Sequence, residues 1–191
     1  MDLLSLNCRD GRIYAVLKRA CKAAVFLMKV NSFAAIHRKD ARILILGSLP
    51  GKRSIADQQY YAHPRNSFWS ILEAVTGVSA SRPYVERLDA ALNARIALWD
   101  MVAEAVRPGS LDSSILKDTV HFNPIDDLLF SLPRIEKVIL NGGEAARLFK
   151  RAGFDKFCQG QNIEWVHLPS TSPAYASLSL EGKRERWLSE F

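Results

Sequence analysis

The sequence predicts an α/β protein of three layers, in which helices cover both faces of a short, mainly parallel sheet of four strands. Four runs of apolar and β-branched residues support this, because such runs are typical of strands buried on both faces of a parallel sheet. They lie at residues 42–47, 95–99, 137–140 and 163–167. Helical patterns separate them, at about 67–76, 83–92, 124–131 and 143–152, and another follows at 180–191. Strands that alternate with helices indicate an α/β sandwich.

Length and composition favour one globular domain with an added N-terminal segment. The chain has 191 residues, 48% of them hydrophobic, and a chain of this size buries about two thirds of its unfolded surface in one core. Apolar residues at three- and four-residue steps over 11–28 predict a helix. We therefore expect an N-terminal extension at 1–31, helical in character, and a single α/β domain at 32–191.

Charge, cysteine count and hydropathy limit the partners. Lys and Arg outnumber Asp and Glu by 26 to 20, a moderate excess that permits a polyanionic partner without demonstrating one. Three cysteines without CxxC spacing and four histidines argue against a zinc or iron–sulfur site. No apolar run approaches the ~18 residues of a membrane span, and the first apolar stretch is shorter than a secretory signal requires. We expect a cytoplasmic monomer without cofactor, metal or membrane contact, nucleoid-associated in a bacterium; an organelle address at the N-terminus is the less favoured alternative.

The loops after the predicted strands are the places to look for a site, because ligands of open parallel sheets bind beyond the carboxyl ends of the strands. The first such loop, GSLPGKRS at 47–54, superficially resembles a phosphate-binding P-loop. The spacing fails, since only three residues separate the glycines and Arg53 follows Lys52. Its glycines could still let the backbone approach a ligand closely. A tight turn without a ligand is the equally weighted alternative.

Two further loops carry polar and aromatic groups. Residues 58–69 gather amide, basic and aromatic side chains just before a helix, with Asn66 in a position typical of an N-cap. Residues 168–174 combine small hydroxyl side chains with two prolines, which stiffen the connection. Taken alone, each is an ordinary strand-to-helix loop.

Together, the loops resemble the uracil-DNA glycosylase superfamily, and most closely its hypoxanthine-DNA (deoxyinosine) glycosylase branch. The resemblance covers about residues 32–190 and rests on five strings in the order of that branch: GSLPGKRS at 47–54, YYAHPRNSFW at 60–69, ALWDMVAEAVRPGSLDSSI at 97–115, ILNGGEAARLF at 139–149 and LPSTSPA at 168–174. It implies the fold of that superfamily and a monofunctional DNA glycosylase of base excision repair. Such an enzyme flips a deaminated base, here above all hypoxanthine, out of double-stranded DNA and hydrolyses its N-glycosidic bond.

The resemblance also implies roles for individual residues at the base. Asn66 would hold the attacking water and Tyr61 would stack on the extruded base. The turn would bind the leaving base through Gly47, Ser48, Leu49, Pro50 and Gly51. Asn123 is a candidate reader of the base edge, with a simple cap before Pro124 as the favoured alternative.

The DNA-binding residues implied by the resemblance surround the same loops. Lys52 and Arg53, in what we expect to be a flexible basic loop, would contact phosphates together with Arg65 and Arg107. Three acidic residues, Glu136, Glu144 and Asp155, are expected on the sides or the far end of the molecule. The minor-groove loop would comprise Pro169, Ser170, Thr171, Ser172 and Pro173, with Tyr175 as an added stacking wedge.

The sequence departs from the superfamily in three places. Many members have an acid or amide where Leu49 stands, and a histidine where Leu168 stands. His167 is displaced by one residue, so strand alternation should turn it to the opposite face. Tyr175 replaces the usual asparagine of this branch. A uracil or mismatch-specific glycosylase of the same fold, and a catalytically silent binder of damaged DNA, therefore remain as alternatives.

Overall fold

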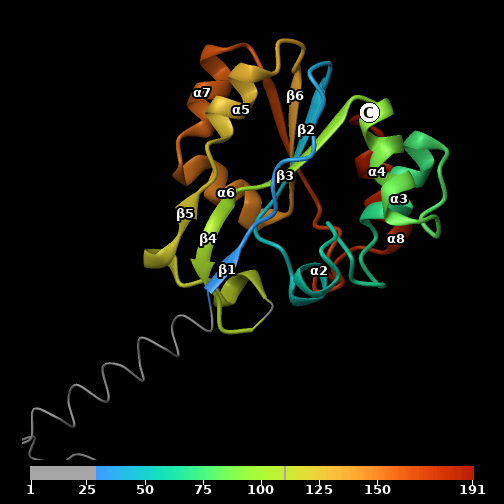
Figure 1. Cartoon of the computed structure of the whole chain (residues 1–191), viewed down its shortest axis with the longest axis horizontal. Coiled ribbons are helices and arrows are strands. Elements are labelled where there is room, and N and C mark those ends of the chain that lie inside the picture. Colours follow the sequence, from blue (N-terminus) through green and yellow to red (C-terminus); the bar gives the residue numbers. More distant parts are fainter. Residues whose placement is uncertain (1–28, 110) are drawn as a thin grey trace, which may run out of the picture.

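A parallel four-stranded sheet forms the centre of the computed structural model, which describes residues 29–109 and 111–191 (Figure 1). Its strands are β2 (Ile43–Gly47), β3 (Ile96–Asp100), β6 (Lys137–Asn141) and β7 (Glu164–Leu168), in the order β3-β2-β6-β7. All three strand pairs are parallel. Each strand lies within a residue or two of its predicted run, so the predicted sheet is confirmed. The helix predicted over 11–28 lies outside the described residues.

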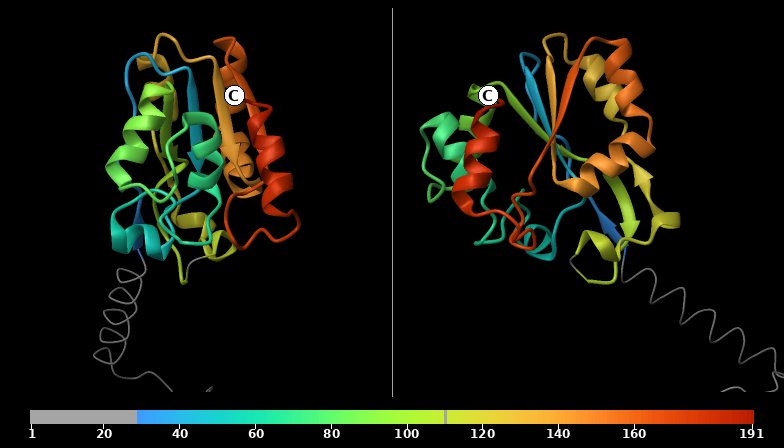
Figure 2. Two further views of the ribbon diagram at one scale, coloured as in Figure 1. Left: turned by 90° about the vertical axis from the view of Figure 1, so that its right-hand side faces the viewer. Right: turned by 180° about the vertical axis from the view of Figure 1, so that it is seen from behind.

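Helices cover both faces of this sheet, as the views from two sides show (Figure 2). One face carries α5 (Ile125–Ser131), α6 (Gly143–Arg151) and α7 (Phe154–Gly160). The opposite face carries α3 (Phe68–Thr76), α4 (Tyr84–Asn93) and α8 (Leu180–Leu188). The predicted three-layer α/β/α sandwich is therefore confirmed, whereas α7 was not predicted.

Two hydrophobic clusters, one on each face, hold the layers together. Because alternate strand residues point to opposite faces, Leu44 and Leu46 pack in one cluster with Phe149, while Ile45 packs in the other with Phe68 and Trp187. All six side chains are fully buried. This packing fixes the strand ends from which the loops of the site emerge.

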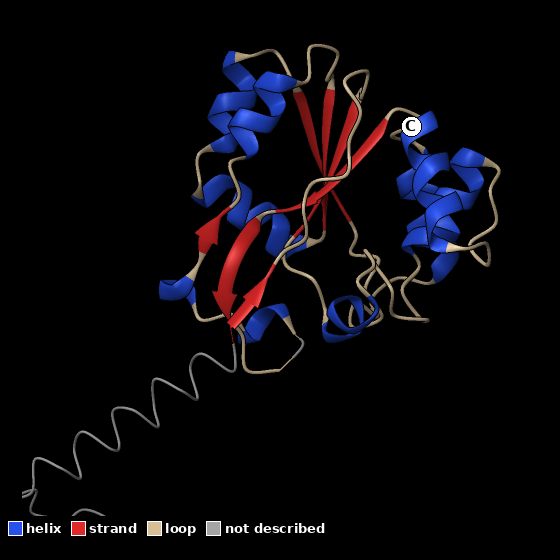
Figure 3. Ribbon diagram, viewed as in Figure 1, coloured by secondary structure: helices blue, strands red, loops and turns tan. Residues whose placement is uncertain are grey.

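A second, smaller sheet was not predicted from the sequence. It is antiparallel, in the order β1-β4-β5, and comprises β1 (Lys29–Asn31), β4 (Val102–Val106) and β5 (His121–Phe122) (Figure 3). The strands β1 and β5 have three and two residues, too few to show a period of two. The last three residues of the predicted N-terminal extension thus form part of a sheet.

The segment after the first loop is a short helix rather than a flexible loop. Lys52 is the first residue of α2 (Lys52–Asp57), whose N-cap is Gly51. The expectation of a flexible basic loop at Lys52 and Arg53 is therefore wrong, because six residues are too short for a helical period to appear in the sequence. Two 3-10 turns follow β4, η1 (Asp112–Ser114) and η2 (Lys117–Thr119). Within residues 29–109 and 111–191, no helix has the length and apolar character that a membrane span needs.

Candidate active site

A cavity of about 840 Å³ opens at the carboxyl ends of β2, β3 and β6. This volume lies within the range of small-molecule and cofactor sites. Each of the loops singled out in the sequence contributes to it, and the lining comprises residues 47–54, 60–61, 63, 65–66, 100, 111–113, 141–144 and 170–175. The structure therefore brings Asn66, Tyr61, the turn at 47–51 and most of the loop at 168–175 to one place.

The turn at 47–51 is anchored by its carbonyl groups. The backbone N–H of Met101 donates to the carbonyl oxygen of Gly47 at 2.8 Å, and that of Val102 donates to Ser48 at 3.1 Å. The next two carbonyls, of Leu49 and Pro50, accept hydrogen bonds from the guanidinium of Arg107. With its carbonyl oxygens held on the protein side, this turn can offer a ligand the N–H groups of Ser48, Leu49 and Gly51, which make no hydrogen bond to the described residues.

The assignment of Arg107 to a DNA phosphate is wrong. Its side chain is 2% exposed and is used inside the protein to hold the turn. Burial lowers the pKa of this guanidinium, while the nearby carboxyl groups of Asp112 and Asp100 raise it. Sequence spacing placed Arg107 near the site correctly, but it gave no information on the direction of the side chain.

Asp100, the last residue of β3, lines the cavity and was not singled out in the sequence. The residue is 4% exposed, and its Oδ2 is buried without a hydrogen-bond partner in the part of the chain that the structure describes. Burial and, to a smaller extent, the charge of Asp112 raise the pKa of Asp100 to about 7, while the charge of Arg107 opposes them. Its position as an acidic residue ending a buried strand was the signal that could have identified it.

Gly47 makes room for this carboxyl group. A Cβ atom at position 47 would lie 2.5 Å from Oδ1 of Asp100 and 3.2 Å from the hydroxyl oxygen of Tyr61. Real Cβ atoms do not approach buried groups so closely, so a glycine is required here for steric reasons. The two oxygen atoms therefore converge on the glycine that opens the first loop.

Asp112, a half-buried residue, contributes another carboxyl group to the cavity lining. Its Oδ2 accepts a hydrogen bond of 2.7 Å from the hydroxyl of Ser48. Burial raises the pKa of Asp112, and the bond from Ser48 and the charge of Arg107 lower it. Ser48 thus contributes to the site by orienting a carboxylate, as well as by its place in the turn.

Tyr61 is fixed in place from one side. Its ring stacks on Phe68 with 3.8 Å between ring centroids and 21° between planes. The backbone at Tyr61 has a φ of +55°, a left-handed conformation that is uncommon outside glycine and asparagine and is often kept at functional sites. One face of the ring is thus used by Phe68, and the residue also lines the cavity.

Asn66 lies in the cavity lining at the start of α3, half-buried. Its Oδ1 accepts a hydrogen bond of 3.0 Å from the backbone N–H of Phe68. This bond satisfies one of the free N–H groups that begin a helix, but Asn66 precedes the N-cap residue, which is Ser67 and not the predicted Asn66. The same contact orients the amide at the cavity wall.

The loop at 168–175 is held by residues that the sequence placed at the DNA. Thr171 is fully buried, and Asn141 bonds both its backbone N–H and its hydroxyl at 2.9 Å. The carbonyl of Thr171 accepts from the N–H of Ser67 at 3.0 Å, next to Asn66. Pro169 is also buried, and its carbonyl accepts from the indole of Trp187. Pro169 and Thr171 therefore serve mainly to fix the loop, although Thr171 also borders the cavity.

The other members of that loop reach the cavity. Ser170, Ser172, Pro173 and Tyr175 all line it, and Tyr175 is 37% exposed with the ammonium of Lys183 5.3 Å from its ring centroid. Asn141, which anchors the loop, was not singled out in the sequence, although it too ends a buried strand.

Asn123 lies away from the cavity lining. It is 6% exposed, and its Nδ2 donates to the hydroxyl of Ser32 at 3.0 Å and to the carbonyl of Asp100 at 2.8 Å. Both amide hydrogens are thereby used within the protein. The structure places Asn123 as a support for the end of β3, not in contact with the cavity.

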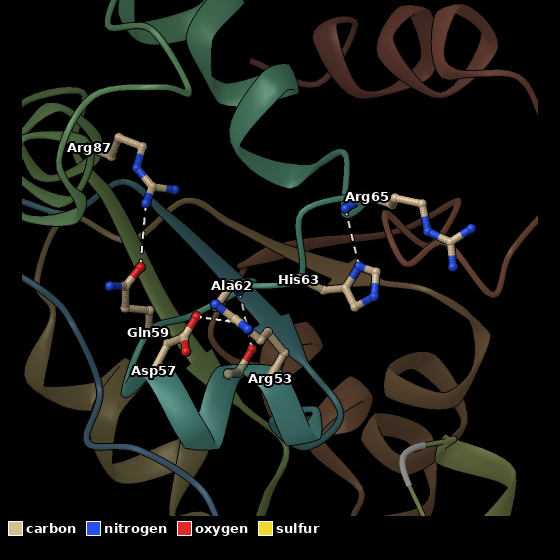
Figure 4. Close-up of polar contacts among 8 residues, drawn as sticks. Arg53, Asp57, Gln59, Ala62, His63, Arg65 and Arg87 are labelled. Atoms are coloured by element: carbon tan, nitrogen blue, oxygen red, sulfur yellow. Dashed lines mark hydrogen bonds and ion pairs between the residues drawn. The ribbon is translucent and has the colours of Figure 1, made fainter.

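Basic side chains stand at the rim. Lys52, Arg53 and Arg65 are exposed and line the cavity. Nε of Arg53 pairs with Asp57 at 2.7 Å, whereas Arg65 uses its backbone N–H to bond His63 and extends its guanidinium away from it (Figure 4). The expectation for Glu144 is wrong, because this residue also lines the cavity, with its carboxylate paired to Arg147 at 2.6 Å.

Comparison with known proteins agrees with this geometry. The sequence profile of the uracil DNA glycosylase superfamily matches residues 34–191. The chain belongs to the uracil DNA glycosylase superfamily. Within this family of DNA glycosylases it is 32% identical over 167 residues to a hypoxanthine DNA glycosylase of Methanosarcina barkeri, covering 86% of this chain and 99% of the relative.

Two proteins from Methanosarcina acetivorans extend the comparison. A hypoxanthine DNA glycosylase is 31% identical over 162 residues, covering 84% of this chain and 97% of the relative. A solution NMR structure assigned provisionally as a uracil DNA glycosylase has a TM-score of 0.68 and 32% identity, covering 85% of this chain and 99% of that chain. The superfamily fold therefore spans the described α/β sandwich.

The departures from the superfamily pattern have a structural place in this member. Leu49 and Leu168 are each 5% exposed and pack in the two core clusters. His167 is exposed at the preceding position of β7, as strand alternation predicted. At both leucine positions this DNA glycosylase therefore has core side chains, and the polar groups of its cavity come from other positions.

Proposed function

We propose that this DNA glycosylase removes hypoxanthine from double-stranded DNA by simple hydrolysis. The observation that carries the proposal is the convergence of Asn66, Tyr61 and the turn at 47–51 on one cavity at the carboxyl end of the sheet. The two Methanosarcina relatives named hypoxanthine DNA glycosylase match over almost their whole length and support the choice of base. The cavity has room for one base and its sugar.

The extruded base would lie against Tyr61. Phe68 covers one face of the tyrosine ring, so the stacking face would be the other. Aromatic stacking of this kind contributes about 1–3 kcal/mol per base. The base stacked there would lie above the backbone of Gly47, which carries no side chain to obstruct it.

Asn66 would orient the attacking water. An amide cannot remove a proton near neutral pH, but it can hold water in line with the anomeric carbon. The departing base leaves an electron-poor, oxocarbenium-like sugar, which needs little nucleophilic help. The contact between Oδ1 and the N–H of Phe68 supports this role, because a side chain held in one rotamer positions water more accurately than a free one.

The turn at 47–51 would bind the leaving base. Its carbonyl oxygens are occupied by Met101, Val102 and Arg107, which favours N–H groups as the contacts available to a ligand. Negative charge develops on the base as the glycosidic bond breaks. Preorganised donors stabilise such charge strongly in a site that excludes water.

The rim would hold the duplex on either side of the extruded nucleotide. Lys52 and Arg65 are suited to phosphate contacts, and Arg53 less so because it is paired with Asp57. Tyr175, together with Ser170, Ser172 and Pro173, would press on the minor groove near the emptied position.

We propose hydrolysis without a covalent enzyme–DNA intermediate. A lysine that forms a Schiff base must be largely uncharged, which usually requires removal from water. Lys52, the lysine at the cavity, is exposed at the start of α2. Borohydride treatment during turnover should therefore trap no adduct, and trapping at Lys52 would contradict this part of the proposal.

The experiment that tests the substrate is strand incision after alkali treatment of duplexes that carry a single inosine or a single uracil. Faster incision at inosine supports the proposal. Faster incision at uracil would favour the alternative that the superfamily name suggests. Incision at neither, with duplex binding intact, would indicate a silent binder of damaged DNA.

A further inference from the structure

Two buried polar atoms at the cavity lack a partner. Oδ2 of Asp100 and the hydroxyl oxygen of Tyr61 have no hydrogen bond to any described residue. More than about nine in ten buried polar groups in proteins are paired, so each exception needs a physical reason. Both residues line the same cavity, and both approach Gly47. Their position favours a ligand as the missing partner.

The two carboxyl oxygens of Asp100 are not equivalent. Oδ2 is the buried one, whereas Oδ1 lies on the side of Gly47, 2.5 Å from where a Cβ of that residue would be. A proton on Oδ2 would be a buried donor without an acceptor among the described residues. An unsatisfied acceptor is tolerated better than an unsatisfied donor. A proton on this carboxyl group is therefore best placed on Oδ1, where Gly47 leaves space.

The surroundings of Asp100 favour its neutral form. The charge of Asp112 opposes ionisation, and Arg107, the cation that favours it, directs hydrogen bonds to the carbonyls of Leu49 and Pro50 instead. The titratable groups that the other elements bring near Asp100 are tyrosine hydroxyls, which carry no positive charge. These groups are Tyr60 and Tyr61 of the loop before α3, and Tyr84 of α4. Burial together with the charge of Asp112 raises the pKa of Asp100 to about 7, against the opposing charge of Arg107.

We propose that Asp100, as a neutral carboxylic acid, donates a hydrogen bond from Oδ1 to the carbonyl oxygen that deamination creates on the extruded base. The inference rests on the proposed function and identifies a residue that selects deaminated bases. Deamination replaces an amino group, which donates hydrogen bonds, by a carbonyl oxygen, which accepts them. A fixed donor therefore binds hypoxanthine and meets the amino group of adenine donor to donor. A site built to pair one polar group can discriminate strongly against an analogue that leaves it unpaired.

The same bond would help the reaction. As the bond between sugar and base breaks, its electron pair moves onto the base, and part of this charge reaches the carbonyl oxygen. A hydrogen bond from a neutral acid strengthens as that charge grows. Ionised Asp100 would instead place a negative charge against the departing base.

The test compares Asp100→Asn with Asp100→Ala in the full chain, by single-turnover excision from an inosine duplex between pH 5.5 and 9. An asparagine keeps an N–H donor and an acceptor but cannot ionise. We expect wild-type excision to fall at least ~10-fold above the pKa of Asp100. The excision rate of the asparagine variant should stay within ~10-fold of wild type at pH 6 and should not fall at higher pH. The alanine variant should be ~100-fold slower than wild type at pH 6 and should show no further decline at higher pH.

Asp112→Asn is the matched control for the electrostatic argument. It keeps a group that can accept from Ser48 and removes the charge that opposes ionisation of Asp100. The decline of excision should then move to lower pH. A decline that stays in place or moves to higher pH would contradict the role of Asp112.

Two results would overturn the proposal. One is an asparagine variant as slow as the folded alanine variant at every pH, because it would show that the ionised carboxylate is needed. The other is a carboxyl ¹³C signal of Asp100, assigned by its absence in the asparagine variant, that titrates below pH 5 in the free protein. A wild-type enzyme that excises neither inosine nor uracil would instead defeat the proposed function itself, so the two failures are distinguishable.

Discussion

The two ends of the central sheet both carry a hollow with arginines around it, yet only one has the character of an active site. At the amino end, a cavity of about 460 Å³ is lined by Arg42, Arg95, Arg134 and Glu136. At the carboxyl end, the cavity of about 840 Å³ has Lys52, Arg53 and Arg65 at its rim. Positive charge is thus common to both ends.

The difference lies in the buried polar groups. At the amino end, Arg42 pairs with Glu136 at 2.6 Å, and both side chains are about half exposed, so water screens and satisfies them. At the carboxyl end, Tyr61, Asp100 and Arg107 each bury a polar atom that has no partner among the described residues. The cavity at the carboxyl end therefore differs from the one at the amino end in its buried polar groups without partners, and not in its positive charge.

The largest effect should follow from Asn66→Ala. Removal of a group that positions the attacking water should lower single-turnover excision of hypoxanthine at least ~100-fold. Because the bond to Phe68 is lost as well, unfolding should require about 1 kcal/mol less free energy. Single-turnover rates and melting curves measure the two effects separately.

Ser179→Ala provides the control for the capping contact. Ser179 caps α8 by accepting from the N–H of Gly182 at 3.1 Å, and it follows the loop at 168–175 without lining the cavity. This variant should lose similar stability and keep normal excision. Normal excision by Asn66→Ala, or an equal loss in both variants, would remove Asn66 from the mechanism.

A smaller effect concerns stability and pH at Asp100. Its pKa is raised from 3.8 to about 7 in the folded protein, so the folded state binds more protons than the unfolded state between these values. The free energy of unfolding should therefore fall as pH rises from about 4 to 7 and then level off. In Asp100→Asn this contribution is absent. The free energy of unfolding of the variant, relative to that of wild type, should therefore rise by about 2 kcal/mol as the pH goes from 5 to 8. Urea denaturation at both pH values tests this, and a constant difference would contradict the raised pKa.

The smallest effects should separate the two groups of cations. Replacement of Lys52 and Arg65 by alanine should weaken binding to damaged and undamaged duplex alike and reduce the slope of log affinity against log salt by about 0.9 per lost phosphate contact. The matched control is the replacement of Arg95 and Arg134 by alanine, which removes the same charge at the amino end. That variant should keep the wild-type slope and excision rate. Equal slope changes in the two variants would show that the cations act only through net charge.

The sequence predicted those parts of the fold that have a period or a run long enough to recognise. The buried strands and α3 to α6 are of this kind. The six residues of α2 and the short strands β1 and β5 are not, which is why Lys52 was placed in a loop and the second sheet was missed. The strands β1 and β5 form by pairing with β4, which lies elsewhere in the chain.

The sequence predicted the site residues that lie in short, unusual motifs. It missed those whose role depends on the direction in which the side chain points. Asn66 and Tyr61 were found in a loop rich in unusual residues. Asp100 directly follows the apolar run predicted at 95–99 and was not singled out, although the fold places its carboxyl group at the cavity. Arg107 shows the converse, since a residue near the site in sequence turned inward to hold the turn.

The most direct test of the contrast between the two ends is amide hydrogen exchange of the full chain with and without an excess of duplex that carries a single inosine. The experiment is designed for the Asn66→Ala variant, so that the inosine duplex is not cleaved during the measurement. Residues 47–67 and 168–175 should become protected more strongly by the inosine duplex than by an undamaged one, while residues 93–96 and 133–136 at the amino end should exchange unchanged. Protection confined to the amino end, or equal protection by both duplexes in the cavity loops, would contradict the assignment of the carboxyl-end cavity as the place where the base is bound.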